Sequence, residues 1–235
     1  MTSFTKIMNW DNIQKSAMDF QNKTPFNFSF LENVFEKSFY DSLFDSYPKL
    51  DKTWYRIEDP DKSTYRKYWF GDNKQIIDKL GDDNEFSESW NTFHRYIHSA
   101  EFEDNFSKFI GIPGLKTKHF TFANLKRGGF QYTHAHNISP STLTMFFYFV
   151  KNWKQGDPGC TYFASGEEDS DILVEPYNLD NTMTLFRDAD NAYHGVRYIE
   201  KDIERRSVCV IMEKFVEGEG WDSERFLKTD HSREQ

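Results

Sequence analysis

The sequence predicts an α+β fold in which helices come first and a sheet of many short strands follows. Apolar residues recur with helical spacing over residues 30–47 and 87–109, and β-branched and aromatic residues gather in short runs between residues 119 and 215. Gly111-Ile-Pro-Gly114 separates the two patterns. This order is typical of α+β proteins, and so many short strands are expected to close into a sandwich or a barrel-like roll.

Two helical regions are predicted in the first half of the chain. Over residues 30–47 an apolar residue recurs at every fourth position, which predicts an amphipathic helix with one face on a core. Pro48 ends this helix. The second region spans residues 87–109 and is expected to break near Glu101.

The segment between these regions, residues 51–73, is charged and also rich in aromatic residues. Its rings belong to Trp54, Tyr55, Tyr65, Tyr68, Trp69 and Phe70. Two interpretations stay open: the segment forms a lid or substrate wall, or it buries its rings against the core.

The second half of the chain carries the strands. They are predicted at residues 119–125, 142–150, 171–175, 181–186, 193–199 and 207–215. Gly156-Asp-Pro-Gly159 and Ser165-Gly166 give turn signals between them.

The 235 residues are predicted to form one domain, because no stretch rich in Gly, Pro or Ser divides them. Within 1–235, residues 1–115 are expected to be a mainly helical part with the aromatic-rich insert. Residues 116–216 form the β-rich core, and residues 217–235 form a C-terminal tail. Aromatic residues make up 18% of the chain, which is enough to build a sizeable core.

Composition excludes several classes of partner. The net charge is -9 and no basic run is longer than a pair such as Arg205-Arg206, which argues against nucleic-acid binding. No segment approaches about 20 apolar residues, so no membrane span is expected. The first residues lack an apolar signal-peptide run, and the two cysteines, Cys160 and Cys209, suit a reducing compartment. We therefore expect a cytoplasmic protein.

The motif His134-Ala-His136 is the first candidate for a metal site. On a strand, residues i and i+2 project to one face, so two imidazoles so placed can converge on one ion. The third ligand must come from another strand, and the candidate is His194. The alternative is that His134 and His136 are polar strand residues that only bond to their neighbours.

Arg205 is the second candidate. It lies eleven residues after His194, and Ser207 follows two residues later. An arginine that points into a roll needs an anion, and its planar fork suits a carboxylate. A metal held by imidazoles with a deeper buried cation is the arrangement that seats a dicarboxylic acid. The alternative is a salt bridge from Arg205 to Glu200 or Glu204.

Several ordered segments together carry a family resemblance. They read FSFLENVFEKSFYDSLFDSYPKL, GIPGL followed by RGGFQYTHAHN, TLTMFFYFVKNWKQGDPGC, VEPYNLDNTMTLFRDADNAYHGV and RRSV. The chain resembles the 2-oxoglutarate- and iron(II)-dependent oxygenases, in the prolyl-4-hydroxylase-like branch, from about residue 26 to residue 215. The resemblance implies a double-stranded β-helix, or jelly roll, with the N-terminal helices packed on one sheet and residues 116–216 as the jelly-roll core.

The resemblance also implies roles for single residues. His134 would be the first metal ligand and His194 the distal one. Arg205 and Tyr148 would hold the far carboxylate of 2-oxoglutarate, and Ser207 is the small hydroxyl residue that closes this pocket. Arg206 replaces Arg205 if the strand register differs by one residue. No catalytic residue beyond the metal ligands is implied.

The sequence departs from the family at position 136. The family motif reads His-x-Asp or His-x-Glu, and here His136 occupies the carboxylate position. Three outcomes are open: His136 binds the metal directly, it swings aside and leaves a position vacant, or a nearby acid supplies the missing charge. The candidates for such a substitute are Asp157, Asp188 and Asp190, and Asn137 is a further alternate. We favour direct ligation by His136.

The expected function is that of a hydroxylase, an oxidoreductase that uses iron(II), 2-oxoglutarate and O2, with ascorbate as a further cofactor that the resemblance allows. Its substrate would be a small molecule, a sugar or a peptidyl residue, and the sequence does not choose among them. Two alternatives remain: a three-histidine dioxygenase that does not use 2-oxoglutarate, and a non-catalytic jelly roll that binds a metal or ligand. Nothing in the sequence sets the oligomeric state.

Overall fold

The structure, a computed structural model, describes residues 6–71, 80–154, 156–157 and 159–225. Its helices are α1 (Trp10–Gln14), α2 (Ala17–Gln21), α3 (Lys37–Asp45), α4 (Glu88–Ile97) and α5 (Ala100–Ile110). Its strands are β1 (Phe28–Glu32), β2 (Tyr55–Asp59), β3 (Lys62–Tyr68), β4 (Leu115–Leu125), β5 (Phe130–His136), β6 (Leu143–Phe149), β7 (Tyr162–Ala164), β8 (Ile172–Val174), β9 (Asp180–Arg187), β10 (Ala189–Val196), β11 (Arg205–Val216) and β12 (Gly220–Trp221).

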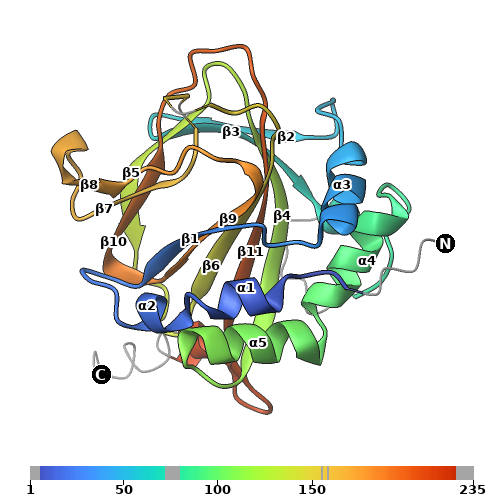
Figure 1. Cartoon of the computed structure of the whole chain (residues 1–235), viewed down its shortest axis with the longest axis vertical. Helices are drawn as coiled ribbons and strands as arrows, with labels where there is room; N and C mark the ends of the chain where they lie inside the picture. The colour runs from blue at the N-terminus through green and yellow to red at the C-terminus, as the bar shows by residue number, and fades with distance from the viewer. Residues whose placement is uncertain (1–5, 72–79, 155, 158, 226–235) are drawn as a thin grey trace, which may run out of the picture.

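The strands of the described residues join in one curled sheet with the order β1-β9-β6-β11-β4-β3-β5-β10-β7-β8. One wall consists of β9, β6, β11 and β4, and the facing wall of β5, β10, β7 and β8. Strand β3 joins the two walls, because it pairs with β4 on one side and with β5 on the other. Figure 1 shows the helices gathered beside the first wall, with the second wall on the far side. The predicted α+β jelly roll is confirmed.

The first wall has an apolar face and a mixed face because side chains alternate along each strand. On β11, Val208, Val210 and Met212 belong to the large core that also contains the buried residues of the helices. Ser207 and Cys209 alternate with them and lie on the opposite face. The inside of the roll is therefore lined by residues that the helices do not cover.

Two serines set the helix boundaries that face this wall. Ser87 caps α4 by accepting a hydrogen bond from the backbone of Trp90, and Ser99 caps α5 by accepting one from Phe102, each at 3.3 Å. The break therefore falls before Ala100, one residue ahead of the predicted Glu101, because Ser99 starts a new helix there.

The helix predicted over residues 30–47 is wrong in its first part. Residues 28–32 form β1, which pairs antiparallel with β9, and the helix begins only at Lys37. Between them, Asn33 adopts a positive φ of 53°, which interrupts any continuous helix. Residues 28–32 pair with the sheet although the apolar residues of this region recur at every fourth position. An edge strand that is buried on one face can show such spacing by chance.

The aromatic segment forms the β2–β3 hairpin and the short turn after it. Trp54 and Trp69 are buried in the core, whereas Tyr55 and Phe70 are about half exposed. Strands β1, β2 and β3 thus lie within the part of the chain expected to be mainly helical.

The remaining strand predictions fit closely, and β10 is the exception. It begins at Ala189 and ends at Val196, earlier than the predicted 193–199. Both cysteines are buried free thiols. Within the described residues, no helix combines the length and apolar character that crossing a membrane requires.

Candidate metal centre and co-substrate pocket

Three histidines converge inside the roll. His134 and His136 lie on β5, and His194 lies on β10, directly opposite His134 in the antiparallel register. The ring centres of His134 and His194 are 4.3 Å apart, and those of His136 and His194 are 4.9 Å apart. One possible ligand atom from each residue lies within 4.8 Å of the other two. The prediction that these distant histidines share one place thus agrees with the geometry.

All three rings present the same nitrogen to this shared place. His134 Nδ1 donates to the carbonyl of Tyr132 at 2.8 Å, and His194 Nδ1 donates to that of Ala192 at 2.9 Å. His136 Nδ1 faces the carboxylate of Asp188 at 3.3 Å. A carbonyl or carboxylate oxygen only accepts, so each Nδ1 carries the proton and each Nε2 keeps its lone pair.

Burial also favours the neutral, metal-binding form of His134 and His194. It holds the pKa of His194 well below its usual range and lowers the pKa of His134. Gln131 donates to His134 Nε2 at 3.0 Å, a contact that requires this lone pair. Three neutral imidazole donors suit iron, zinc, copper or nickel, so the residues present fit a resident transition metal.

Asp188 is the acid that lies closest to the histidines. It is buried, and its second oxygen accepts hydrogen bonds from the backbone of Ile138 and Ser139. Its carboxylate therefore orients His136 from behind rather than taking that residue's place.

The other alternates lie elsewhere. Asp157 pairs with Lys201, and its second oxygen accepts from the backbone of Lys154 at 3.0 Å. Asp190 and Asn137 are exposed. The structure thus gives Asp188 a contact to the cluster and gives none of these three an equivalent one.

Arg205 is a buried cation, only 2% exposed, on the inside of β11. Its guanidinium donates to Ser207 at 3.2 Å, to Thr161 at 3.0 Å and to Tyr148 at 3.4 Å. None of these partners is an acid, and Nε has no partner among the described residues. Glu204 instead pairs with Arg206, so the alternative salt bridge does not account for Arg205. A buried guanidinium without an anion is costly and calls for one.

Tyr148 lies beneath Arg205, whose guanidinium carbon is 5.0 Å from the centre of the ring. Its hydroxyl is already shared with Thr161 at 2.8 Å and Thr184 at 2.6 Å. The hydroxyl that lines the cavity beside Arg205 is that of Thr161. Tyr148 thus holds both Arg205 and Thr161 in place.

Arg206 points the other way. Its guanidinium pairs with Glu204 at 3.0 Å and lies 5.6 Å from the centre of the Tyr47 ring. The register therefore places Arg205, not Arg206, on the inner face.

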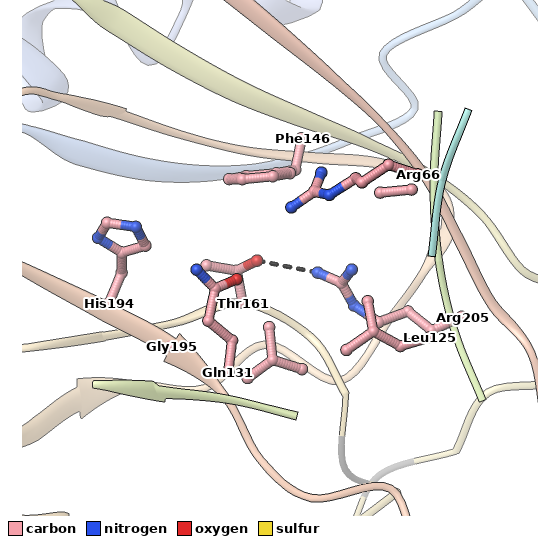
Figure 2. Close-up of a pocket in the computed structure, with 10 residues that line it drawn as sticks. Arg66, Leu125, Gln131, Phe146, Thr161, His194, Gly195 and Arg205 are labelled. Atoms are coloured by element: carbon pink, nitrogen blue, oxygen red, sulfur yellow. Dashed lines mark hydrogen bonds between the residues drawn. The ribbon is translucent and has the colours of Figure 1, made fainter. Parts of the chain in front are cut away.

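Figure 2 shows His194 and Arg205 at opposite ends of one small cavity, with Thr161 and Gln131 between them. Sequence reasoning missed Thr161, Gln131 and also Arg66, which enters the same cavity from β3. Arg66 belongs to the charged, aromatic-rich segment of the sequence. It reaches the site only because β3 pairs with β4 and β5.

No protein-family model matches this sequence, and no curated protein matches it either. Solved structures do share its fold. A prolyl-4-hydroxylase of Pseudomonas putida matches with a TM-score of 0.60 at 12% identity, covering 87% of this chain and 100% of that chain. A prolyl hydroxylase of Trichoplax adhaerens, in complex with a hypoxia-inducible-factor peptide fragment, has a TM-score of 0.60 at 12% identity, with 90% and 94% covered. HygX of Streptomyces hygroscopicus, with nickel, 2-oxoglutarate and hygromycin B bound, has a TM-score of 0.56 at 12% identity, with 87% and 88% covered.

These likenesses define the class to which the fold belongs. The chain has the double-stranded β-helix of the 2-oxoglutarate- and iron(II)-dependent oxygenases, prolyl-4-hydroxylases among them. The family resemblance drawn from the sequence motifs is thereby confirmed at the level of the fold.

Proposed function

We propose that the protein is an iron(II)- and 2-oxoglutarate-dependent oxygenase that hydroxylates a C–H bond of its substrate. One observation carries the proposal: His194, which belongs to the cluster of three histidines, lines the same cavity as the buried guanidinium of Arg205, which has no acidic partner among the described residues. His194 lies at one end of this cavity and Arg205 at the other. A metal ion at the first end would accept the histidine lone pairs, and a carboxylate at the second end would balance the charge of Arg205.

The residues of the chain would divide the work. His134, His136 and His194 hold the metal through their Nε2 atoms, and Asp188 orients His136. Arg205, with Thr161 beside it, holds the far carboxylate of 2-oxoglutarate. Bound iron(II) would supply oxygen activation coupled to decarboxylation of 2-oxoglutarate to succinate, while the chain positions the reactants and excludes water.

The substrate class is proposed more broadly. The neighbouring structures hold a peptide fragment in one case and hygromycin B in another. We propose a small molecule, a sugar or a peptidyl residue as substrate, and O2 as the oxidant, with ascorbate as a possible supporting reductant.

Anaerobic titration of iron(II) and 2-oxoglutarate tests the proposal, with the metal-to-ligand charge-transfer band as the readout. The wild type should form the band. Arg205→Ala should raise the apparent dissociation constant of 2-oxoglutarate roughly ten- to a hundredfold, since a charge-assisted pair contributes about 1.5–3 kcal/mol. Metal binding should stay intact in this variant. Arg206→Ala, whose guanidinium lies outside the cavity, is the matched control and should change neither quantity.

His136→Ala and His136→Asp separate the roles of that residue. If His136 is a ligand, the alanine variant should bind iron(II) more weakly and the aspartate variant should retain it. Equal affinity in all three proteins would show that His136 does not bind the metal.

Two results would replace the proposal by its alternatives. Oxygen consumption that does not depend on 2-oxoglutarate would indicate a three-histidine dioxygenase. Zinc at full occupancy, together with no iron-dependent succinate formation, would indicate a non-catalytic jelly roll.

A further inference from the structure

Arg66 is a second cation inside the roll. It lies on β3, which joins the two walls, and Figure 2 shows its guanidinium pointing toward the same space as that of Arg205. Its backbone pairs with β2 and β4, but its guanidinium makes no hydrogen bond or ion pair with another described residue. A guanidinium stays charged and offers a planar fork of donors, so the half-buried Arg66 presents an unpaired positive charge to this space.

Arg66 lines both an inner and an outer cavity of the described part of the chain, and Arg205 lines the inner one. The inner cavity, between His194 and Arg205, has a free volume of about 10 Å³. The outer cavity has a free volume of about 260 Å³ and also reaches the histidine cluster, since His136 and His194 line it. An anion in the outer cavity therefore meets Arg66 and not Arg205.

No acidic residue among those described lines either cavity. Asp188 contacts His136 without lining either cavity, and Asp61, Glu167 and Asp190 line a separate groove of about 610 Å³. They leave the charge of Arg66 unbalanced within the outer cavity.

The other polar groups of the outer cavity do not balance this charge either. Burial, with a smaller contribution from Arg66, lowers the pKa of His119 to about 4, so its ring is neutral near pH 7. Burial raises the pKa of the Cys209 thiol to about 11, although Arg66 opposes the rise, so the thiol stays protonated. Arg66 is thus the one charged side chain among the described residues that line this cavity.

We propose that the substrate carries a carboxylate, which Arg66 binds in the outer cavity beside the three clustered histidines. This inference rests on the proposed function and names its substrate class. When iron(II) and 2-oxoglutarate are bound, the two positive charges of the metal cancel the two negative charges of the co-substrate. Of the remaining charges, Arg205 and Arg66 are positive and Asp188 is negative, which leaves a net charge of one positive unit at the site. One carboxylate neutralises that charge, which a doubly charged phosphate would exceed.

The size and lining of the outer cavity fit a small organic acid or one carboxylate-bearing end of a larger molecule. Its volume of about 260 Å³ lies just below the range of typical ligand pockets. Phe146, Ile138 and Ile211 supply apolar walls, while Thr121 and Thr144 supply hydroxyls. A carbon skeleton can therefore lie on the apolar side while its carboxylate meets Arg66.

Benzoate and benzamide are a suitable pair of probes, because they share shape and differ in charge. Calorimetric titration is carried out under nitrogen on the protein saturated with iron(II) and 2-oxoglutarate, so that the metal and Arg205 are already occupied. The wild type should bind benzoate at least about tenfold more tightly than benzamide. Arg66→Met should abolish this preference and Arg66→Lys should keep part of it. Arg56→Met, which removes an exposed charge from the neighbouring strand β2, should leave it unchanged.

The affinity for 2-oxoglutarate, measured in the same variants, separates this proposal from the preceding one. Arg66→Met should retain that affinity, whereas Arg205→Met should lose it. Equal binding of the two probes by the wild type would overturn the inference, as would a loss of 2-oxoglutarate in Arg66→Met as large as in Arg205→Met. If the wild type fails to bind 2-oxoglutarate, the proposed function fails. The probe preference is then measured in Arg205→Met without co-substrate, where it must still depend on Arg66.

Discussion

Position 136 would set the charge at the proposed metal centre. The family that the sequence resembles has a carboxylate at this position of its motif, and here it is an imidazole. The carboxylate of Asp188 lies behind that imidazole, 3.3 Å from His136 Nδ1. A carboxylate so placed raises the basicity of the ring and fixes its orientation. Asp188 thus returns part of the negative charge that the substitution removes.

Asp188→Asn should therefore weaken metal binding by roughly 10- to 100-fold, because the amide removes the charge behind His136 while keeping the size of the side chain. The measurement is competition for the metal against a chelator of known affinity. Asp190→Asn, at an exposed position two residues further along the chain, is the control and should have no effect. Unchanged affinity in Asp188→Asn would mean that Asp188 only supports the loop through Ile138 and Ser139.

Much of the site was accessible from the sequence, and the missing part has a physical cause. Spacing along one strand brought out His134 and His136, and the motif order brought out His194 and Arg205. Thr161 and Arg66 were not accessible in this way. They reach the cavity through pairing between strands far apart in the chain, and periodicity within one segment carries no information about such pairing.

The contact between β5 and β10 holds the histidine cluster together. A β-carbon at Gly195, next to His194, would lie 2.8 Å from the carbonyl oxygen of Gln131 on β5 and would also collide with the ring of Tyr162. Atoms of this kind do not approach so closely, so only glycine allows β10 to lie this near its neighbours.

Gly195→Ala should consequently lower the free energy of unfolding by about 1–3 kcal/mol, the usual cost of overpacking. It should also weaken metal binding, since β10 carries His194 away from His134 as it shifts. Urea denaturation and the chelator competition measure the two effects. If the free energy of unfolding and the metal affinity both kept their wild-type values, β10 would not depend on the close contact of Gly195 with Gln131 and Tyr162.

The boundaries of an element were predictable where its buried residues recur with the period of a single helix or strand. They were less predictable where the element forms only by pairing with a strand far away in the sequence. The alternation along β4, β6 and β11 was legible because one face packs on helices. Residues 28–32 were not, because their strand structure depends on β9, which comes about 150 residues later.

At the scale of the whole molecule, the fold buries several histidines in their neutral form. His94 is 1% exposed, stacks on Trp69 with ring centres 4.0 Å apart, and its Nε2 has no partner among the described residues. Burial lowers the pKa of His94 to about 3 and the pKa of His98 to about 4, with smaller contributions from neighbouring positive charges. The unfolded chain should titrate these rings near pH 6.5.

These differences predict that the metal-free protein loses stability as the pH falls below about 6.5. Between that value and about pH 4 the unfolded chain binds protons that the folded protein does not, so acidification favours unfolding. Each such histidine contributes a slope of up to about 1.4 kcal/mol per pH unit, and its contribution to stability is complete above pH 6.5. Urea denaturation from pH 7.5 to pH 4.5 measures the slope.

His94→Phe isolates one contribution, because the phenyl ring can keep the stacking on Trp69 and cannot take up a proton. The variant should show a shallower loss of stability between pH 6.5 and pH 4.5, by up to about 1.4 kcal/mol per pH unit. At pH 7.5, where His94 is neutral in both states, the variant should be at least as stable as the wild type, since the buried Nε2 without a partner is gone. Parallel pH profiles for the two proteins would mean that His94 takes up its proton inside the fold. The acid sensitivity would then have to come from the carboxylates or from the histidines of the metal centre.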